Sequence, residues 1–371
     1  LRAEMRVCDA RQNAGLVSLD DAGRFLADGE TWVPEGVCSY PLLEHAGNLR
    51  MAEVLDVFAQ AEALGRTVVR TNAFFDGGDN RARLRNDDGS MNETGLVGLD
   101  RLLDAAREAR VKLVLVLANY WTDYGGIDAV LRSVAPGETP ARDAFWTGSR
   151  AIEAQQRYIT ALVTRVNTLN GQAYAEDATI LAWELMNEAR CDDRKPCDSE
   201  TLVTWAQTMT DSVRAAGAQQ LVAWGGAGHA GEHGEDFEAM AASGAVDVLT
   251  LHVYPESTQP ELLVDLHGAN RARVGAAIGS ATITDRARVA RRFGRPLLVE
   301  ELGWHPANGD AADHERAWVM AQWMATAQQE SVGTLPWMIA EHDREDYDGL
   351  LIRPWQDTET AAVLGCGEPP P

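Results

Sequence analysis

The sequence predicts an α/β protein of the (β/α)8 barrel type. Short apolar, β-branched segments alternate along the chain with longer segments whose apolar residues recur at helical spacing. Eight strand-like segments are found, and no short period repeats along the chain. Alternation of this kind implies a parallel sheet, and eight such units in one chain favour a closed barrel over an open sheet.

The eight strands are expected at 32–40, 67–74, 111–119, 179–188, 220–224, 246–253, 296–301 and 333–339. The helices between them are expected at 49–64, 96–109, 149–169, 201–216, 235–242, 284–293 and 311–329. The segment 111–119 is an almost continuous apolar run, which is typical of a strand buried on both faces of a parallel sheet. The segment 256–280 shows no regular pattern, and we expect it to be irregular.

Composition favours one large domain. The chain has 371 residues, 45% of them hydrophobic, and its glycines are spread along it rather than gathered in a linker. A barrel of this type commonly needs 250 residues or more as a single unit. We therefore expect one domain over residues 1–371, acting as a monomer.

The net charge of −23 excludes several partners. A field of that sign repels nucleic acid and anionic membranes, so neither is expected as a partner. A soluble acidic surface and adaptation to high salt both explain the charge. No apolar run reaches the roughly 18 residues that span a bilayer, and the N-terminus lacks a signal-peptide pattern. Because a mature secreted chain lacks its signal peptide, this N-terminus is compatible with export, and we expect a secreted or periplasmic protein.

The five cysteines are odd in number, so at least one has no partner within the chain. Cys191 and Cys197 flank a short charged loop, and a disulfide between them would hold that loop in place. Cys38 lies within an expected strand and is interpreted as a small buried hydrophobic residue. The other two are Cys8 and Cys366.

Two apolar strands end in carboxylates. The strand 179–188 ends in Asn187 and Glu188, and the strand from 296 ends in Glu300 and Glu301. In a barrel, catalytic groups lie where strands end, so these carboxylates should face one another across one mouth. Paired carboxylates are the apparatus of a glycoside hydrolase, with Glu188 as acid and base and Glu301 as nucleophile. Glu300 is the rival of Glu301, because strand alternation places these neighbours on opposite faces.

Polar and aromatic residues at other strand ends complete the candidate site. Arg70 would hold a nucleophile ionised, and Asn187 would bind a sugar hydroxyl. His252 and Tyr254 leave one strand on the same face and would position the nucleophile. A structural ion pair for Arg70 and a core role for His252 stay open. Tryptophans at strand ends suit sugar rings, although 11 tryptophans must also fill a core; the candidates are Trp121, Trp304 and Trp337.

Three further patterns are interpreted as non-functional. The segment 226–231 matches G-x-G-x-x-G but no strong helix opens on it. His229 and His233 are four residues apart, but the glycines around them oppose a metal-binding helix. The aspartates of the loop 76–92 lack the spacing of a calcium loop. No metal or cofactor is expected.

The segment 180–191 resembles the acid/base strand of family 5 glycoside hydrolases, in their endo-β-1,4-mannanase branch. Segments 69–74, 119–126, 251–255 and 299–303 are similar to other strand ends of that family, in the same order. Trp337 and segment 348–352 resemble the close of its barrel. The resemblance covers about residues 25–355.

The resemblance implies a (β/α)8 (TIM) barrel and a retaining mechanism on β-mannan or manno-oligosaccharides. It selects Glu301 as the nucleophile, because Leu302 and Gly303 stand where the family has an aromatic residue and glycine. It also supports Arg70 and Asn119 as substrate-binding residues, together with Trp121, Asn187, His252, Tyr254, Trp304 and Trp337. The chain departs from the family pattern at Asn72, Ala189 and 225–228, among other positions.

Those departures leave alternatives. An exo-acting β-mannosidase or a transglycosylase of the same family would use the same two carboxylates. A β-1,4-glucanase differs only in its contacts to the sugar 2-hydroxyl. A non-catalytic carbohydrate-binding barrel is disfavoured, because both strand-end carboxylates and Arg70 are present.

Overall fold

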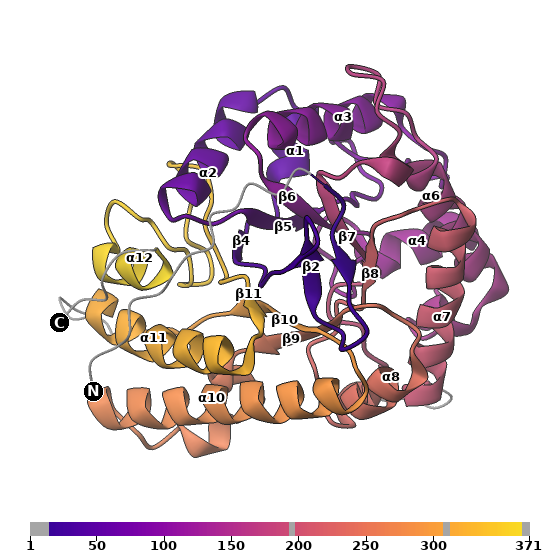
Figure 1. Ribbon diagram of the computed structural model, residues 1–371. Coiled ribbons are helices and arrows are strands. Elements are labelled where there is room, and N and C mark those ends of the chain that lie inside the picture. Colours follow the sequence, from indigo (N-terminus) through magenta and orange to yellow (C-terminus); the bar gives the residue numbers. More distant parts are fainter. Residues whose placement is uncertain (1–14, 193–196, 307–311, 366–371) are drawn as a thin grey trace.

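The structure is a computed structural model that describes residues 15–192, 197–306 and 312–365. Cys8 and Cys366 lie outside these residues. Eight parallel strands form the centre of the molecule (Figure 1). They are β4 (Gly36–Cys38), β5 (Val68–Asn72), β6 (Lys112–Val116), β7 (Ile180–Glu184), β8 (Leu221–Ala223), β9 (Leu249–Val253), β10 (Leu297–Leu302) and β11 (Gly333–Thr334).

The eight strands close into a ring. Neighbouring strands pair in parallel from β4 to β8 in chain order, and β10 pairs with both β9 and β11. Parallel bridges from Ala223 to Val248 and from Glu35 to Thr334 join the two sets at both edges. The predicted (β/α)8 barrel is therefore confirmed, with every carboxyl strand end at one mouth.

Helices surround the ring on the outside (Figure 1). The α-helices are α1 (Leu42–Gly47), α2 (Met51–Ala63), α3 (Glu93–Glu108), α4 (Gly126–Val134), α5 (Ala144–Thr147), α6 (Ser149–Val163), α7 (Ser199–Ala215), α8 (Phe237–Ser243), α9 (Pro255–Thr258), α10 (Gly268–Arg292), α11 (Ala312–Glu330) and α12 (Thr358–Leu364). Three short 3-10 helices are η1 (Tyr174–Glu176), η2 (Glu232–Gly234) and η3 (Pro260–Leu262). Local signals start some of these helices: Asn92 caps α3, and Asp198 with Thr201 forms a capping box on α7.

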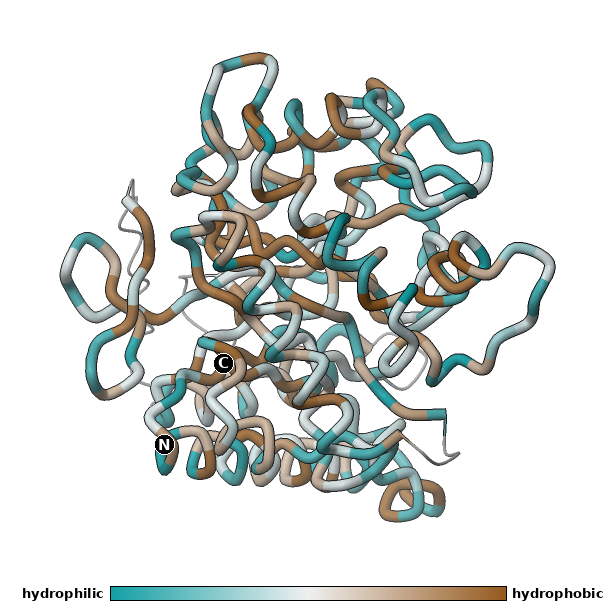
Figure 2. Tube along the Cα trace, turned by 90° about the vertical axis from the view of Figure 1, so that its right-hand side faces the viewer, coloured by the Kyte–Doolittle hydropathy of each residue, from teal (hydrophilic) through white to brown (hydrophobic). Residues whose placement is uncertain are grey.

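Two hydrophobic cores hold the barrel together. One lies between the ring and the helices and contains most of the apolar helix faces. The other fills the inside of the ring, where Val68, Val114 and Leu298 meet Phe25 and Trp32. The last two belong to a small antiparallel sheet, formed by β1 (Ser18–Leu19), β2 (Phe25–Ala27) and β3 (Glu30–Thr31), which lies across the ring in Figure 1. Figure 2 shows hydrophobic segments through the middle of the molecule and hydrophilic ones on the outer loops.

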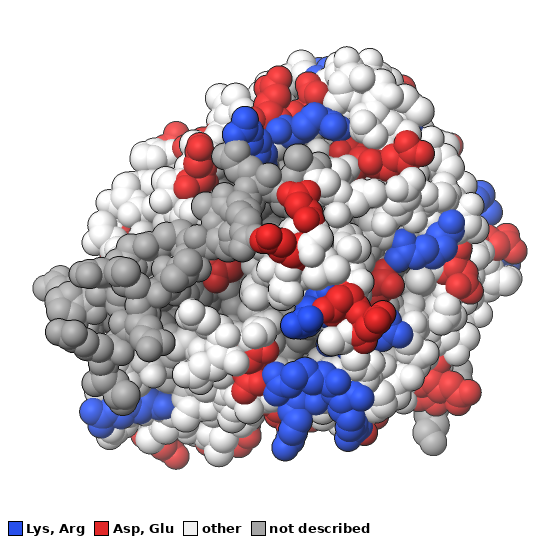
Figure 3. All heavy atoms as spheres, viewed as in Figure 1, with Lys and Arg blue, Asp and Glu red and all other residues white. Residues whose placement is uncertain are grey.

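Surface charges of both signs are interspersed on the face shown in Figure 3. Arginines gather over α10, but several are paired with acidic residues: Arg288 with Asp285, and Arg291 with Glu330 at 2.6 Å. Among the described residues, no helix has the length and apolar character that crossing a membrane requires.

Several expected boundaries are wrong. The expected strands 32–40 and 333–339 are regular strands only over Gly36–Cys38 and Gly333–Thr334, and helix α4 begins within the expected loop after β6. The largest error is α10, expected at 284–293 but starting at Gly268. Its glycines hid the helical pattern; Gly275 and Gly279 are needed because a Cβ atom there would meet the rings of Trp304 and Trp323.

Candidate active site

Glu188 lies at the mouth of the barrel, just beyond the end of β7. The amide of Asn187 donates to the carbonyl of Ala118 at 2.8 Å, and the amide of Glu188 donates to the carbonyl of Gly225 at 2.7 Å. The chain is thus held between the ends of β6 and β8. Glu188 has a φ of 51°, in the left-handed region that costs a non-glycine residue free energy. Such positions concentrate at functional sites, and this one turns the carboxylate into the mouth.

Glu301 projects from β10 into the same mouth. One carboxylate oxygen accepts from Nη1 of Arg70 at 2.6 Å, and the other accepts from the hydroxyl of Tyr254 at 2.8 Å. A buried carboxylate with a donor on each oxygen is held in one orientation. These are the requirements of a carboxylate nucleophile.

The expectation that strand alternation separates Glu300 from Glu301 is wrong. The pairing of β10 with β9 shifts register between Val299 and Glu301, so the residue between them has no partner in the ladder. This bulge lets both carboxylates reach His252: Oε1 of Glu300 lies 3.2 Å from Nε2, and Oε2 of Glu301 lies 3.5 Å from Nδ1. Both glutamates therefore belong to one buried cluster.

Arg70 of β5 links the carboxylates of two other strands, β7 and β10. Its Nε and Nη2 donate to the two oxygens of Glu184 on β7 at 2.8 and 2.6 Å. Nη2 also donates to Oδ1 of Asn187 at 2.7 Å, and Nη1 donates to Glu301. Burial lowers the pKa of Arg70, but the charges of these glutamates raise it well above its ordinary value. Arg70 is a permanent buried cation that orients the nucleophile.

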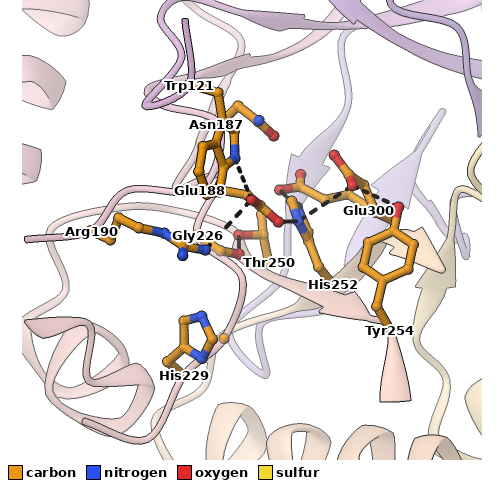
Figure 4. Close-up of polar contacts among 12 residues, drawn as sticks. Trp121, Asn187, Glu188, Arg190, Gly226, His229, Thr250, His252, Tyr254 and Glu300 are labelled. Atoms are coloured by element: carbon orange, nitrogen blue, oxygen red, sulfur yellow. Dashed lines mark hydrogen bonds and ion pairs between the residues drawn. The ribbon is translucent and has the colours of Figure 1, made fainter. Parts of the chain in front are cut away.

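His252 lies between Glu188 and Glu300 (Figure 4), and its Nδ1 is also 3.5 Å from Oε2 of Glu301. Its Nδ1 is 2.9 Å from Oε1 of Glu188. Burial lowers the pKa of His252, but the charge of Glu301 and the hydrogen bonds to Glu188 and Glu300 raise it well above its ordinary value. The imidazole therefore holds a proton within reach of Glu188 at neutral pH.

Glu188 itself is held ionised in the substrate-free site. Burial raises its pKa, but the hydrogen bond and charge of His252, together with Arg190 and Trp121, lower it to about 2. Trp121 donates from Nε1 to Oε2 of Glu188 at 2.6 Å, and Nη2 of Arg190 lies 3.6 Å from the same oxygen. A general acid must gain a proton before it can act, and His252 is the adjacent donor.

The separation of the two candidate catalytic groups is short. One oxygen of Glu188, one of Glu301 and a ring nitrogen of His252 all lie within 4.8 Å of one another. Retaining glycosidases hold their carboxyl groups about 5–5.5 Å apart, whereas inverting ones need at least about 6.5 Å. The spacing therefore fits the retaining arrangement. Within the described part of the chain, Glu188, His252 and Glu301 also have donor atoms close enough together to hold a metal ion.

These carboxylates open into a cavity of about 680 Å³. Its walls contain Arg70, Asn119, Trp121, Asn187, Glu188, His252, Tyr254, Glu301 and Trp337, all of which were predicted from the sequence. Trp337 stacks on Tyr40 with ring centroids 5.6 Å apart and donates from Nε1 to Asp348 at 2.9 Å. On another wall, the guanidinium of Arg190 lies 4.6 Å from the Trp121 ring. Aromatic faces thus line the cavity at two places.

Sequence reasoning missed part of this lining. The missed residues follow strand ends in loops, and they include Tyr40, Asp123, Tyr124, Arg190, His229, His233, His305, Tyr347 and Asp348. His229 and His233, dismissed as metal ligands, lie with their ring centroids 5.3 Å apart on the cavity wall. Glu184, which lies behind the cavity wall, was also missed. A charged residue in an otherwise apolar strand is a signal that identifies such a buried site residue.

The prediction that Trp304 binds substrate is wrong. Its side chain is fully buried and packs against Gly275 of α10, and its Nε1 donates to Glu315 of α11 at 2.9 Å. Trp304 follows β10 but faces the outer helices, because the chain has already turned away from the mouth.

We expect Trp304→Ala to lower the free energy of unfolding by about 3–5 kcal/mol, because it leaves a cavity beneath α10 and α11. The KM for substrate should not change at temperatures where the variant is folded. Urea denaturation and initial-rate kinetics check both statements. A stable variant with a raised KM would restore Trp304 to the substrate site.

A disulfide joins Cys191 to Cys197, with Cα atoms 5.5 Å apart. It lies beside the cavity, since the amide of Cys191 donates to the carbonyl of His233 at 2.7 Å. The carbonyl of Arg190 accepts from Nε1 of Trp146 at 3.1 Å. Residues 193–196 lie outside the described residues. Cys38 is buried and free.

We expect the double variant Cys191→Ser/Cys197→Ser to lose about 2 kcal/mol of stability, the amount for closing a short loop. Its kcat/KM should fall several-fold, because Arg190 and His233 lose part of their support. Thermal denaturation and kinetics with and without dithiothreitol check this. The reductant should weaken the wild type and leave the double variant unaffected; equal effects on both would contradict the assignment.

Comparison with known proteins now adds to this geometry. The family model described as GH family 5 beta-mannosidase-like matches residues 44–328. The chain belongs to glycoside hydrolase family 5. A rice (Oryza sativa subsp. japonica) relative, mannan endo-1,4-beta-mannosidase 3, is 33% identical over 78% of this chain and 63% of its own length. Tomato (Solanum lycopersicum) mannan endo-1,4-beta-mannosidase 1 is 27% identical over 96% of this chain and 91% of its own.

Two solved structures show the same fold. The endo-1,4-beta-mannanase from Rhizomucor miehei superposes with a TM-score of 0.79 at 25% identity, covering 94% of this chain and 97% of that one. A family 5 mannosidase from the same organism gives a TM-score of 0.76 at 18% identity, covering 95% and 96%, and supports the fold alone. This chain spans 62–64% of the lengths of three rice relatives, which is less than two thirds.

Proposed function

We propose that this chain is a retaining endo-β-1,4-mannanase that acts on mannan or glucomannan. The observation that carries the proposal is the pair Glu188 and Glu301, which line one cavity of about 680 Å³ and have one oxygen of each within 4.8 Å of the other. The substrate class is supported by the relatives, since those compared above are named mannan endo-1,4-beta-mannosidases. The aromatic walls at Trp121 and Trp337 suit pyranose faces.

In the proposed mechanism, Glu301 attacks the anomeric carbon and forms a glycosyl-enzyme. Glu188 gives its proton to the departing glycosidic oxygen as that bond breaks. Glu188 then removes a proton from water, and the water oxygen displaces Glu301. Two displacements return the sugar with its original β configuration.

The neighbouring residues support these steps. Arg70 and Tyr254 each donate to one oxygen of Glu301, which aims the attacking carboxylate. The side-chain Nδ2 of Asn187 donates to Oδ1 of Asn119 at 3.0 Å, while the side-chain Oδ1 of Asn187 accepts from Arg70. This fixes Asn187 at the mouth, where its side chain is placed to bind a sugar hydroxyl near the reacting carbon.

Assays on mannan, glucomannan and cellulose side by side test the substrate. We expect hydrolysis of the first two and little of the third, with NMR of the first product showing the β anomer. Hydrolysis of cellulose alone would make the chain a glucanase, and an α-anomeric first product would rule out the retaining mechanism. Binding of mannan without hydrolysis would indicate a carbohydrate-binding barrel.

One observation favours a second candidate. The matching family model is described as beta-mannosidase-like, which fits an exo-acting enzyme with the same carboxylates. Products from mannohexaose separate the two: internal cuts give a range of shorter oligosaccharides, whereas exo action releases mannose alone. We expect internal cuts.

We also propose a secreted or periplasmic monomer. Every group in the mechanism comes from one chain, and the disulfide between Cys191 and Cys197 favours an oxidising compartment. Light scattering of the purified protein tests the oligomeric state, and fractionation of producing cells tests the location. A dimer, or enzyme retained in a reducing cytosol, would contradict this proposal.

A further inference from the structure

A second carboxylate pair lies behind the catalytic one. Glu184 on β7 and Glu300 on β10 are fully buried and have their carboxylates in contact inside the ring. Neither side chain lines the substrate cavity. Two adjacent carboxylates in such a place cannot both stay ionised at low cost, so the pair retains a proton.

The contacts of each oxygen indicate where that proton is needed. Both oxygens of Glu184 accept from Arg70. Oε1 of Glu300 lies 3.2 Å from Nε2 of His252. Oε2 of Glu300 is buried without a hydrogen-bond partner, and Nε of Arg70 is 3.7 Å away. A proton shared with Glu184 satisfies this remaining oxygen.

The electrostatic surroundings of Glu184 agree with this geometry. Burial raises the pKa of Glu184, Arg70 lowers it, and the neighbouring Glu300 raises it again, leaving it at about 8. The proton that Glu184 keeps at neutral pH lies beside Glu300, so the two carboxyls can share it.

The other side of His252 faces the acid/base residue. With Nε2–H directed to Glu300, Nδ1 is the nitrogen that can gain or lose a proton, and it lies 2.9 Å from Oε1 of Glu188. A single hydrogen-bonded chain therefore runs from Glu188 through His252 and Glu300 to Glu184.

We propose that Glu300, carrying a proton shared with Glu184, fixes His252 in one orientation so that the imidazole stores the proton that Glu188 uses. Glu300 and Glu184 are positioning residues in this scheme, which rests on the proposed glycosidase function. It explains how Glu188 is ionised in the empty site and still acts as an acid.

The proton moves in two short steps. As the glycosidic oxygen approaches, the proton on Nδ1 of His252 passes to Oε1 of Glu188 and then to the departing oxygen. His252 is left neutral, with Nε2–H still bound to Glu300. In the second displacement, Glu188 removes a proton from water and returns it to Nδ1, which restores the starting state.

Several charged groups face this chain and shape its titration. His252 is met by Glu188 beyond β7, by Glu300 and Glu301 of β10, and at longer range by Glu235 beyond β8. Glu300 is met by Arg70 of β5, Glu184 of β7 and His252 of β9, and its carbonyl accepts from the thiol of Cys38 of β4 at 2.8 Å. Glu188 is also met by Arg190.

The test compares Glu300→Leu with Glu300→Gln on two substrates. One is mannohexaose, whose poor leaving group needs an acid; the other is 2,4-dinitrophenyl β-mannobioside, whose leaving group does not. For Glu300→Leu, we expect kcat/KM on mannohexaose to fall about 10- to 100-fold and that on the aryl substrate to change by less than about threefold. The alkaline limb of its pH profile should move down by about one unit, because His252 loses the acceptor that supports its protonated form.

Glu300→Gln should recover most of the loss on mannohexaose, because an amide offers an oxygen to His252 and an N–H to Glu184, as the protonated carboxyl does. Equal losses on both substrates in Glu300→Leu would show a merely structural role and overturn the proposal. A Gln variant as impaired as the Leu variant would overturn the shared proton. A wild type that hydrolyses neither substrate would instead refute the proposed function.

Discussion

Glu301→Gln is expected to lower kcat on mannan by roughly 10⁴-fold or more, because it removes the nucleophile of the covalent step. The amide keeps the size of the side chain but loses the charge that Arg70 neutralises at 2.6 Å. It also places an N–H against Arg70 or Tyr254, both of which are donors. Initial rates on mannohexaose measure the loss.

Glu108→Gln is a matched control, since Glu108 is an exposed residue at the end of α3. It should keep the wild-type rate. A 2-deoxy-2-fluoro-mannoside with a good leaving group should add its glycosyl mass to the wild type on the peptide containing Glu301. Labelling of Glu300 instead, or an active Glu301→Gln variant, would move the nucleophile to another residue.

Much of this site was predictable because it depends on local patterns. A buried parallel strand reads as an apolar run, and a polar residue at its end marks the barrel mouth. Glu188, Asn187, Arg70 and His252 each follow that rule, so the sequence alone predicts that they lie together.

Features that depend on a neighbouring strand or helix were not predictable in this way. The bulge at Glu300 comes from the register of β10 against β9, which neither segment encodes alone. Strand alternation therefore separated Glu300 from Glu301 wrongly. Similarly, the direction of Trp304 is set by Gly275 on α10, a helix that the sequence pattern did not reveal there.

The roles of Glu184 and Glu300 could not be predicted, because they depend on which residues meet inside the barrel. A sequence pattern shows that a charge falls within an apolar strand, but not which cation faces it. Here one arginine, Arg70 of β5, faces Glu184 of β7 and both Glu300 and Glu301 of β10. Such a cluster is a property of the closed ring.

Glu188→Ala tests the acid/base assignment with the second largest expected effect. On mannohexaose, kcat/KM should fall by about 10²- to 10⁴-fold, the usual contribution of general acid–base catalysis. The 2,4-dinitrophenyl β-mannobioside needs no acid to form the glycosyl-enzyme, so its kcat/KM should change little. Its kcat should fall, because water then lacks a base. A loss of the same size in both kcat/KM values would exclude Glu188 as the acid.

Azide distinguishes an absent base from a damaged site. The alanine leaves space beside Trp121 and His252, where the carboxylate had been. Azide is a strong nucleophile that needs no base, so it should restore kcat on the aryl substrate. Because azide attacks the same face that water would use, the product should be the β-mannobiosyl azide, which NMR identifies. An α-azide would mean that azide had replaced Glu301 rather than water, and it would reverse the two assignments.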